Sequence, residues 1–252
     1  MESIKIYNKK GFLCALHESE LDFFQRCDVV EKSISNLFCF ENLKFPNITI
    51  HPTLVYEDLD LEIDWLLTTD SSKGLPFWEP AATWMIEKDN VTIPLLQVKK
   101  HYKKMQPELL KHEAVHIARS AFKEPIYEEF LAYATSKSKW RCFFGPIFRS
   151  TKESLLFVVL ALLPSLILWL IVPLVAYSLW LLIRLMIHQK IFKTSLDNLS
   201  KIFRTASPLK IAIRLTDKEI KLFARETNIQ SYIDNQSCLR WRLIKSSYLE
   251  NS

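Results

Sequence analysis

The sequence has few glycines and no paired cysteine motif, and both absences narrow the class of protein. Only 3 of its 252 residues are Gly, while 49% are hydrophobic, which favours a well-packed, helix-rich chain over a disordered one. Its five cysteines are scattered and odd in number, and none form a C-x-x-C pair. This usage is typical of free thiols in a reducing compartment rather than of a disulfide framework.

Signals for nucleic-acid binding and for export are also missing. The chain contains no zinc-finger, basic-zipper or glycine-rich phosphate-loop motif, so nucleic acid is not expected as a partner. The first residues, "MESIKIYNKKGFLCALHESE", are too polar for the apolar core of a signal peptide. We therefore expect the N-terminal region to remain in the cytoplasm.

Charge is divided unevenly along the chain. Residues 1–146 carry 18 Lys and Arg against 21 Asp and Glu, a net of −3, whereas residues 147–252 carry 15 against 7, a net of +8. A basic half beside an apolar stretch favours the anionic headgroups of membrane lipids as a partner, ahead of nucleic acid.

The apolar stretch itself lacks charge completely. Residues 154–183 contain no Asp, Glu, Lys, Arg or His, and about 20 apolar residues in a helix cross a bilayer. A buried helix in a soluble core is the disfavoured alternative, because the uncharged run is so long. We expect a transmembrane or intramembrane segment over residues 154–187.

The flanks of this segment bear on its topology. Lys and Arg, which mark the cytoplasmic side, occur on both sides of it, and Pro164 and Pro173 allow breaks. A helical hairpin bent near Pro164–Pro173, with both ends cytoplasmic, satisfies both flanks. A single tilted span is the alternative.

The remaining periodicity predicts an α+β, helix-rich fold. Apolar residues recur every three or four positions before residue 45, which indicates helix, and alternate over residues 48–63, which indicates strands. Residues 81–98 predict a hairpin with its turn at Lys88–Asn90, in which Pro94 makes the second strand an edge strand. Helices are predicted from Gln106 to about Phe122 and from Ile126 to about Lys137.

Three regions follow from these patterns. The first, residues 1–146, is expected to be a zincin-like domain, for reasons given below; the membrane segment comes next. The last, residues 188–252, is a basic helical region in which Thr216 and Glu219 form a capping box. We expect this region either to lie on the membrane face or to pack back on the first domain.

The stretch "HEAVH" carries the strongest chemical signal. His112 and His116 are four residues apart and share one face of the predicted helix, so that both imidazoles can bind one ion at about 2.0–2.1 Å. Glu113 follows the first histidine, where its carboxylate could take a proton from a metal-bound water. The pattern therefore predicts a Zn²⁺ site with two ligands and a general base.

A hydrolytic zinc site needs a third protein ligand and an open fourth position. Pro125 ends the first helix, and a second helix could fold back so that Glu128 or Glu129 faces the histidines, while the small Ala132 lets the helices approach. Spacing alone leaves both glutamates open. The alternative interpretation is an ordinary helix whose solvated face carries Lys111, Glu113 and Arg119.

"HEAVH" followed by "EEFLAY" resembles the gluzincin zinc metallopeptidases. In that family H-E-x-x-H is followed by a helix with a glutamate ligand, often with alanine three positions later, as at Glu129 and Ala132. The resemblance implies His112, His116 and Glu129 as zinc ligands, with Glu128 the second choice, and Glu113 as the general base. It covers residues 107–136, and the short spacing is closest to compact members of the family.

The resemblance also extends beyond the metal ligands. The family places the edge of a β-strand above the active-site helix, and the hairpin at residues 81–98 could play that part by pairing with an extended substrate; a purely structural hairpin is the equal alternative. The membrane segment is similar to that of membrane-bound zinc proteases that act on prenylated or misfolded membrane proteins. Three further side chains could stabilise an oxyanion, although a structural role is favoured for each: Tyr127, Tyr133 and His101.

Two functions of different class fit these patterns. The first is a membrane-anchored zinc metallopeptidase that hydrolyses peptide or protein substrates at the cytoplasmic membrane face. The second is a non-catalytic membrane-associated scaffold or interaction protein with a vestigial or structural metal site. A zinc hydrolase acting on another substrate is a third reading of the same residues.

Overall fold

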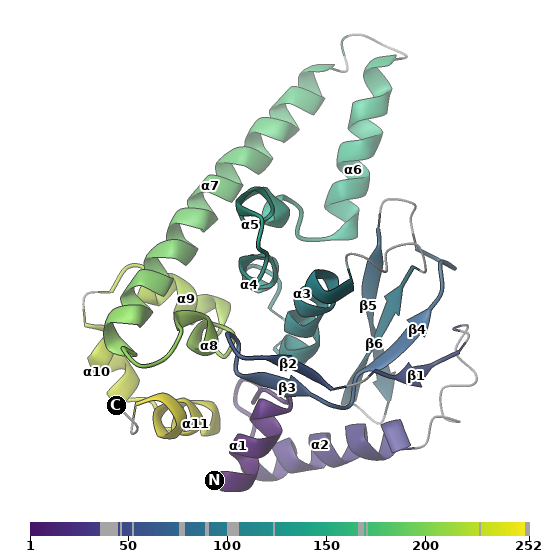
Figure 1. Ribbon diagram of the computed structural model, residues 1–252. Helices are drawn as coiled ribbons and strands as arrows, with labels where there is room; N and C mark the ends of the chain where they lie inside the picture. The colour runs from purple at the N-terminus through teal and green to yellow at the C-terminus, as the bar shows by residue number, and fades with distance from the viewer. Residues whose placement is uncertain are drawn as a thin grey trace.

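The computed structural model describes the chain except residues 36–44, 46, 52, 76–78, 89–90, 100–105, 123, 166–168, 170, 227 and 250–252. It is α+β and helix-rich, with 59% of residues helical and a small mixed sheet. This agrees with the fold class predicted from the sequence. A body of sheet and helices carries a long helical hairpin that rises away from it (Figure 1).

The four-stranded sheet has the order β1-β4-β6-β5. Its strands are β1 (Thr49–Ile50), β4 (Leu67–Asp70), β6 (Val91–Val98) and β5 (Ala81–Lys88). β4 and β6 are parallel, whereas β1 pairs with β4 and β5 with β6 antiparallel. A separate antiparallel pair is formed by β2 (Leu54–Tyr56) and β3 (Leu61–Ile63). The strands predicted over residues 48–63 and the hairpin are confirmed, whereas β4 was not predicted; the turn of the hairpin at residues 89–90 lies outside the described residues.

The prediction that Pro94 places β6 at an edge is wrong. β6 lies between β4 and β5, and β5 is the edge strand. Pro94 is opposite Met85 of β5, and the pairing of β6 with β4 begins only at the next residue, Leu95. Because Pro94 stands just before the stretch that β4 covers, its missing amide removes no hydrogen bond on that side.

Helices cover the sheet and lead toward the histidines. The predicted N-terminal helices are α1 (Glu2–Lys9) and α2 (Glu20–Ser35), and the "HEAVH" helix is α3 (Gln106–Arg119). The second predicted helix, Ile126 to about Lys137, is α4 (Glu128–Ala134); a further helix that was not predicted, α5 (Lys139–Phe144), and a 3-10 turn at Gly145–Ile147 follow it. α5 starts anew because the Ser138 side chain caps it by accepting the Arg141 amide.

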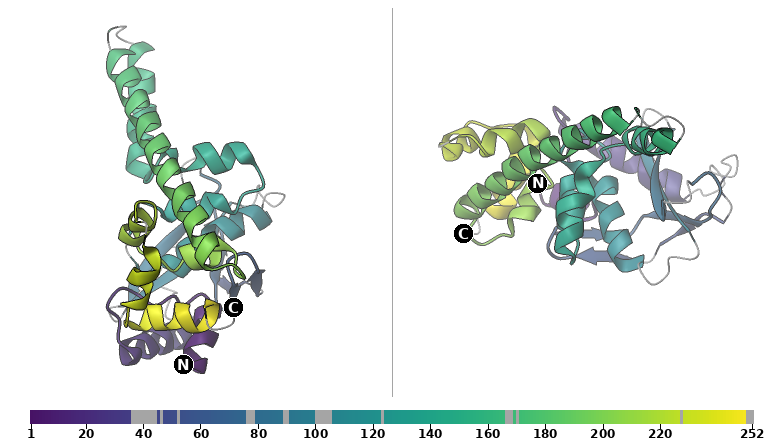
Figure 2. Two further views of the ribbon diagram at one scale, coloured as in Figure 1. Left: turned by 90° about the vertical axis from the view of Figure 1, so that its left-hand side faces the viewer. Right: turned by 90° about the horizontal axis from the view of Figure 1, so that it is seen from above.

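The apolar stretch folds as a helical hairpin. α6 (Thr151–Leu162) and a 3-10 turn (Leu163–Ser165) lead outward, and α7 (Ile171–Ile202) returns to the body (Figures 1 and 2). α7 is long and apolar enough to cross a membrane, and only 11% of its most apolar window is buried. The chain therefore reverses as a hairpin requires, and α7 is not packed like the core helix of a soluble protein.

An ion pair fixes the base of the hairpin. The Arg184 guanidinium on α7 donates to both carboxylate oxygens of Glu153 on α6, at 2.6 and 2.7 Å, and to the Ile147 carbonyl at 2.8 Å. Charge-assisted, bidentate hydrogen bonds of this kind are geometrically specific. They tie both helices of the hairpin to the chain that leads out of α5.

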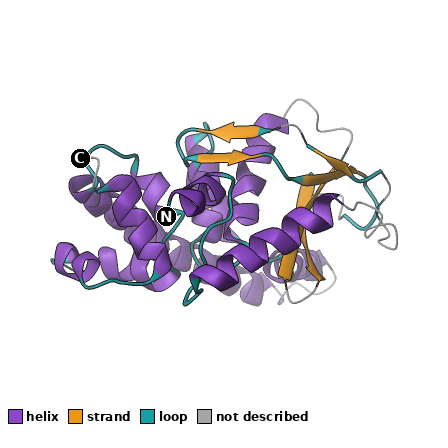
Figure 3. Cartoon of the chain, turned by 90° about the horizontal axis from the view of Figure 1, so that it is seen from below, coloured by secondary structure: helices purple, strands orange, loops and turns teal. Residues whose placement is uncertain are grey.

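The C-terminal region packs back on the first domain, which is one of the two alternatives predicted from the sequence. It consists of α8 (Pro208–Ala212), α9 (Asp217–Phe223), α10 (Ile229–Asp234) and α11 (Leu239–Tyr248), and its apolar residues belong to the same core as those of α1 and the sheet. These helices lie at the opposite side of the molecule from the four-stranded sheet (Figure 3). The capping box at Thr216 and Glu219 is confirmed.

A buried arginine joins this region to the N-terminus. The Arg214 guanidinium, 1% exposed, donates to the Asn8 side chain at 2.7 Å and to the Leu59 carbonyl at 3.1 Å. Four cysteines, Cys14, Cys27, Cys142 and Cys238, are free thiols, as expected for the chain; Cys39 lies outside the described residues.

Candidate metal centre

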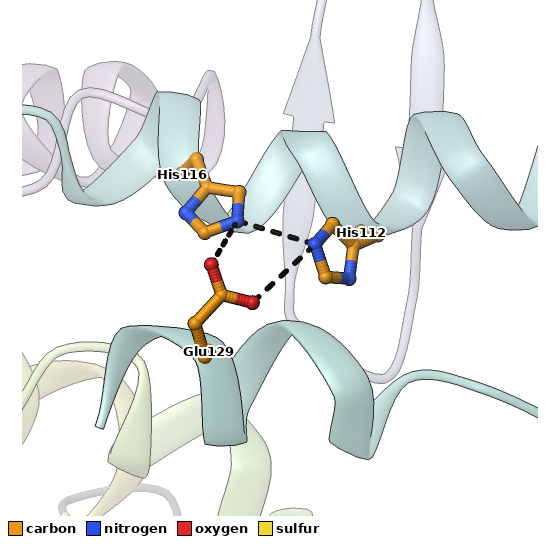
Figure 4. A group of neighbouring side chains, drawn as sticks. All are labelled: His112, His116 and Glu129. Atoms are coloured by element: carbon orange, nitrogen blue, oxygen red, sulfur yellow. Dashed lines mark hydrogen bonds and ion pairs between the residues drawn. The ribbon is translucent and has the colours of Figure 1, made fainter. Parts of the chain in front are cut away.

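Three side chains from two facing helices converge beside the sheet. His112 and His116 project from α3 toward Glu129, which lies in the first turn of α4 (Figure 4). The two Nε2 atoms are 3.3 Å apart. The Glu129 carboxylate lies 3.7 Å from His112 Nε2 through one oxygen and 3.5 Å from His116 Nε2 through the other.

These separations fit a tetrahedral metal ion. Zinc binds imidazole nitrogen and carboxylate oxygen at about 2.0–2.2 Å, which places neighbouring ligand atoms of a tetrahedron about 3.3–3.6 Å apart. The 3.3 Å between the two Nε2 atoms matches that spacing, and each Nε2 faces a different oxygen of Glu129 at a similar distance. His112, His116 and Glu129 therefore form a group that could hold a metal ion.

Glu128, the alternative third ligand, takes a different position. Its Oε1 atom lies 2.6 Å from His116 Nδ1, on the side of the ring that faces away from His112 and Glu129. A carboxylate at this nitrogen holds a proton on Nδ1 and leaves the Nε2 lone pair free for an ion. Glu128 thus orients a histidine of the group and does not join the group itself.

Glu113 is buried beside the histidines rather than solvated. The residue is 7% exposed, and its carboxylate accepts a hydrogen bond of 2.6 Å from the Thr83 hydroxyl on β5. Arg119 on the same helix is fully buried and donates to the carbonyls of Ile213 and Leu215. The alternative interpretation of a solvated face at Glu113 and Arg119 is therefore wrong.

Burial and mutual charge shift the pKa values of His112, Glu113, His116 and Glu129. Burial lowers the pKa of His112 to about 3 and raises that of Glu129 to about 7. It also raises the pKa of Glu113. For His116 burial acts downward, but the Glu128 hydrogen bond and the charges of Glu129 and Glu113 outweigh it and raise the pKa to about 9. The carboxylates around His116 thus favour its positively charged form, and a bound cation could take the place of that charge.

The group opens into a cavity of about 520 Å³. Besides the cluster, its lining includes the Ala81–Thr83 part of β5 and residues at the base of the hairpin, among them Arg149 and Thr151. A carboxylate, two imidazoles and a strand edge consequently surround one space large enough for part of a peptide.

The three predicted oxyanion residues have separate outcomes. Tyr133 lines the cavity, and its ring meets that of His112 edge-on at a centroid distance of 4.5 Å. Tyr127 is fully buried away from the cavity lining, and its hydroxyl lies 3.0 Å from Nδ1 of His188 on α7. The structure therefore does not bring Tyr127 to the cavity, because its hydroxyl contacts His188 of α7 instead. His101 lies outside the described residues.

Sequence reasoning missed the residue that positions α4. Asp217 at the start of α9 accepts hydrogen bonds from the amides of Ile126 at 2.8 Å and Tyr127 at 3.2 Å, immediately before Glu128 and Glu129. Its own amide donates to Glu124 at 2.7 Å. The only signal in the sequence was the capping box around Asp217, which predicts a helix start but not its partner.

Comparison with known proteins adds nothing to this geometry. The chain matches no protein-family model, no curated protein and no solved structure. Function is therefore inferred from the geometry of the site alone.

Proposed function

We propose that this protein is a membrane-anchored zinc metallopeptidase that hydrolyses peptide bonds at the cytoplasmic face of a membrane. The observation that carries the proposal is the convergence of His112, His116 and Glu129: the two Nε2 atoms are 3.3 Å apart, and each faces a different oxygen of the Glu129 carboxylate, at 3.7 and 3.5 Å. A buried carboxylate stands next to this group, and the zincin-like character of the domain belongs to the same proposal.

Each residue of the site has a role in this reaction. His112, His116 and Glu129 would hold the ion, and zinc bound there would supply Lewis-acid chemistry to a water molecule and to the scissile carbonyl. Glu113 accepts a proton from the attacking water and returns it to the leaving amine. Its raised pKa brings it closer to neutrality, as this exchange requires. Thr83 holds one of its oxygens through a 2.6 Å hydrogen bond.

The cavity favours an extended peptide as the substrate. β5 pairs with β6 on one side, and its Ala81–Thr83 segment lines the cavity beside the metal group. The unpaired edge of a strand can bind an extended chain through main-chain hydrogen bonds. Tyr133, which also lines the cavity, is the remaining candidate for a hydrogen bond to the developing oxyanion.

The number of ligands favours catalysis over a structural role. Structural zinc sites are closed by four protein ligands, whereas catalytic sites use three and leave one position open. The described residues supply three, and these line a cavity. A buried Glu113 beside them would be an unfavourable choice for a scaffold, since burying a carboxylate costs free energy that function must justify.

Metal analysis and a matched set of variants test the proposal. The purified full chain should contain about one zinc ion, and His112→Ala should lose it, while His17→Asn at an exposed histidine should not. Glu113→Gln should retain zinc and lose hydrolysis of a denatured protein substrate. Cleavage that persists in Glu113→Gln would remove this residue from the mechanism, and a chain without bound metal would favour the scaffold.

A further inference from the structure

The short helix α5 presents three large aromatic side chains to solvent. Trp140 is 74% exposed, Phe143 42% and Phe144 38%, and their spacing places them on one face of the helix. The rings of Trp140 and Phe144 stack at 5.3 Å, and Phe143 meets Phe144 edge-on at 4.8 Å. A contiguous exposed patch of this kind marks an interaction surface.

This aromatic face is fixed to the base of the hairpin. Gln189 on α7 donates from its side-chain amide to the carbonyls of Cys142 and Phe143, at 3.0 Å each. Arg141 of α5 pairs with Glu108 of α3 at 3.0 Å. α5 is therefore held between the hairpin and the helix of the metal centre, and it runs crosswise to the hairpin (Figure 2, left).

At this level the hairpin changes from apolar to charged. Arg184 lies over the Trp180 ring at 4.5 Å and pairs with Glu153, and Tyr177 stacks on Trp180 at 5.7 Å. Further out, the exposed large side chains of α6 and α7 are apolar, for example Val159 and Val175. Trp and Tyr next to Lys and Arg are the pattern found where a helix leaves the hydrocarbon core of a bilayer.

We propose that α5 lies in the headgroup layer of an anionic bilayer, with Trp140, Phe143 and Phe144 directed toward the acyl chains. This contact sets the height of the body above the membrane and holds the mouth of the metal-centre cavity at the bilayer surface. The cavity is lined by Arg141 of α5 and by Thr151 at the start of the hairpin. The inference rests on the membrane anchoring in the proposed function and is independent of the zinc chemistry.

Charge and continuity identify the bilayer as the occupant of this face. The aromatic face is bonded to α7 at the base of the hairpin, whose two helices expose apolar side chains further out. Exposed lysines in or just before α5 and on α6 and α7 would meet anionic headgroups: Lys137, Lys139, Lys152, Lys190 and Lys193. Each basic residue near such a surface contributes about 1 kcal/mol of attraction.

Depth-dependent fluorescence quenching tests the proposal in the full chain. The introduced cysteine Trp140→Cys would carry an environment-sensitive fluorophore, with Cys39, Cys142 and Cys238 replaced by serine. Cys14 and Cys27 can remain, since both are buried and burial raises the pKa of each thiol to about 12. The protein is reconstituted in phosphatidylcholine vesicles with and without phosphatidylglycerol, containing nitroxide lipids labelled near the headgroup or near the chain end.

Labels at five positions then give distinct results. The label at residue 140, and one at Phe144→Cys as a second site on α5, should be quenched more by shallow than by deep nitroxides, and more strongly with phosphatidylglycerol. A label at Thr151→Cys should behave similarly, which places the cavity mouth at the surface. Val159→Cys on α6 should be quenched by the deep nitroxides, and Leu21→Cys on α2, 67% exposed, by neither.

The outcomes that overturn the proposal are separable. If Val159→Cys is quenched at depth while both α5 labels behave like the Leu21→Cys control, the hairpin inserts but α5 does not contact the bilayer. If no label is quenched, the anchoring in the proposed function fails together with this inference. Zinc content and the Glu113→Gln result are measured without vesicles, so they report on the metal centre in either case.

Discussion

His116 is held between two carboxylates with different tasks. Glu128 contacts Nδ1 at 2.6 Å, while Glu129 faces Nε2 at 3.5 Å. The two glutamates are adjacent in sequence, and successive residues of a helix point in different directions. Glu129 therefore faces the nitrogen that could bind an ion, whereas Glu128 contacts the opposite side of the same imidazole.

Replacing Glu128 should weaken metal binding without abolishing it. Glu128→Gln removes the carboxylate that holds the proton on Nδ1, and loss of such a partner costs about 10–100-fold in metal affinity. Zinc affinity is measured by competition with a chromophoric chelator, and Glu57→Gln at an exposed glutamate serves as the matched control. Equal affinities for the two variants would show that Glu128 has no orienting role.

Gly145 leaves room for the Tyr133 ring against His112. A Cβ atom at this position would overlap the ring, so Gly145→Ala should displace Tyr133 and destabilise the protein by about 1–3 kcal/mol, as overpacking generally does. Thermal denaturation of the single variants and of Gly145→Ala combined with Tyr133→Ala checks this. If steric overlap is the cause, the double variant is less destabilised than the sum of the singles; strict additivity would contradict it.

At the scale of elements, the position of α4 is set from the far end of the chain. Asp217 receives the amides of Ile126 and Tyr127, and it also lies 3.8 Å from the Arg119 guanidinium on α3. One side chain of α9 consequently holds both helices of the metal centre in place.

Asp217→Ala should disturb the metal centre although it lies outside it. The change leaves two amides without their acceptor and a buried guanidinium without one of its carboxylates, which costs about 3–5 kcal/mol when a buried pair is broken. Zinc affinity should fall with it, because Glu129 loses its fixed position. Denaturation and zinc titration are compared with Asp197→Ala, an exposed aspartate of α7; unchanged values would contradict the assignment.

Sequence patterns predicted the helices and strands better than they predicted which of these elements pack together. α3 could be predicted because its apolar period, Pro107 and paired histidines are local features. The inner position of β6 could not be predicted, because it depends on pairing with β4. Leu67 of β4 pairs with Leu95 of β6, although β5 lies between the two strands in the sequence. The choice between Glu128 and Glu129 depended likewise on Asp217, 91 residues from Ile126.

The burial of Glu113 and Arg119 was missed for the same reason. Periodicity shows which residues share a face, but not that the face is covered. Glu113 is covered by Thr83 of β5, which precedes α3 in the sequence. Arg119 is covered by the carbonyls of Ile213 and Leu215, which lie far beyond α3. The family resemblance predicted His112, His116 and Glu129 as ligands, and the structure brings these three side chains together.

At the scale of the whole molecule, the C-terminal helices and the N-terminal body share one core. An ion pair within that core gives folding stability a pH dependence. Glu219 accepts two hydrogen bonds of 2.8 Å from Arg240 and one of 2.6 Å from Trp241. Burial would raise the pKa of Glu219, but the bonds from Arg240 outweigh it and lower the pKa below its ordinary value.

A lowered pKa in the folded state has a definite sign. The stabilisation is complete above the ordinary glutamate pKa of 4.5 and is lost as the pH falls through the lower folded value. Glu219→Gln should therefore cost about 3 kcal/mol near neutral pH, with the difference from the unchanged chain shrinking in acid. Thermal denaturation in detergent from neutral to acidic pH measures this; a difference that is constant with pH would contradict the linkage.

The hairpin and the metal centre meet in one cavity, where Arg149 and Thr151 face the same space as the histidines. The fold thus places the group that could hold a metal ion beside the base of the apolar hairpin, and the proposed function depends on that group.

Anomalous diffraction at the zinc absorption edge, on crystals of the full chain grown with zinc, tests that centre most directly. We expect one strong peak within about 2.0–2.2 Å of Nε2 of His112, Nε2 of His116 and a carboxylate oxygen of Glu129, with a fourth position open to the cavity. A peak elsewhere, or none between these three side chains, would contradict the proposed metal centre.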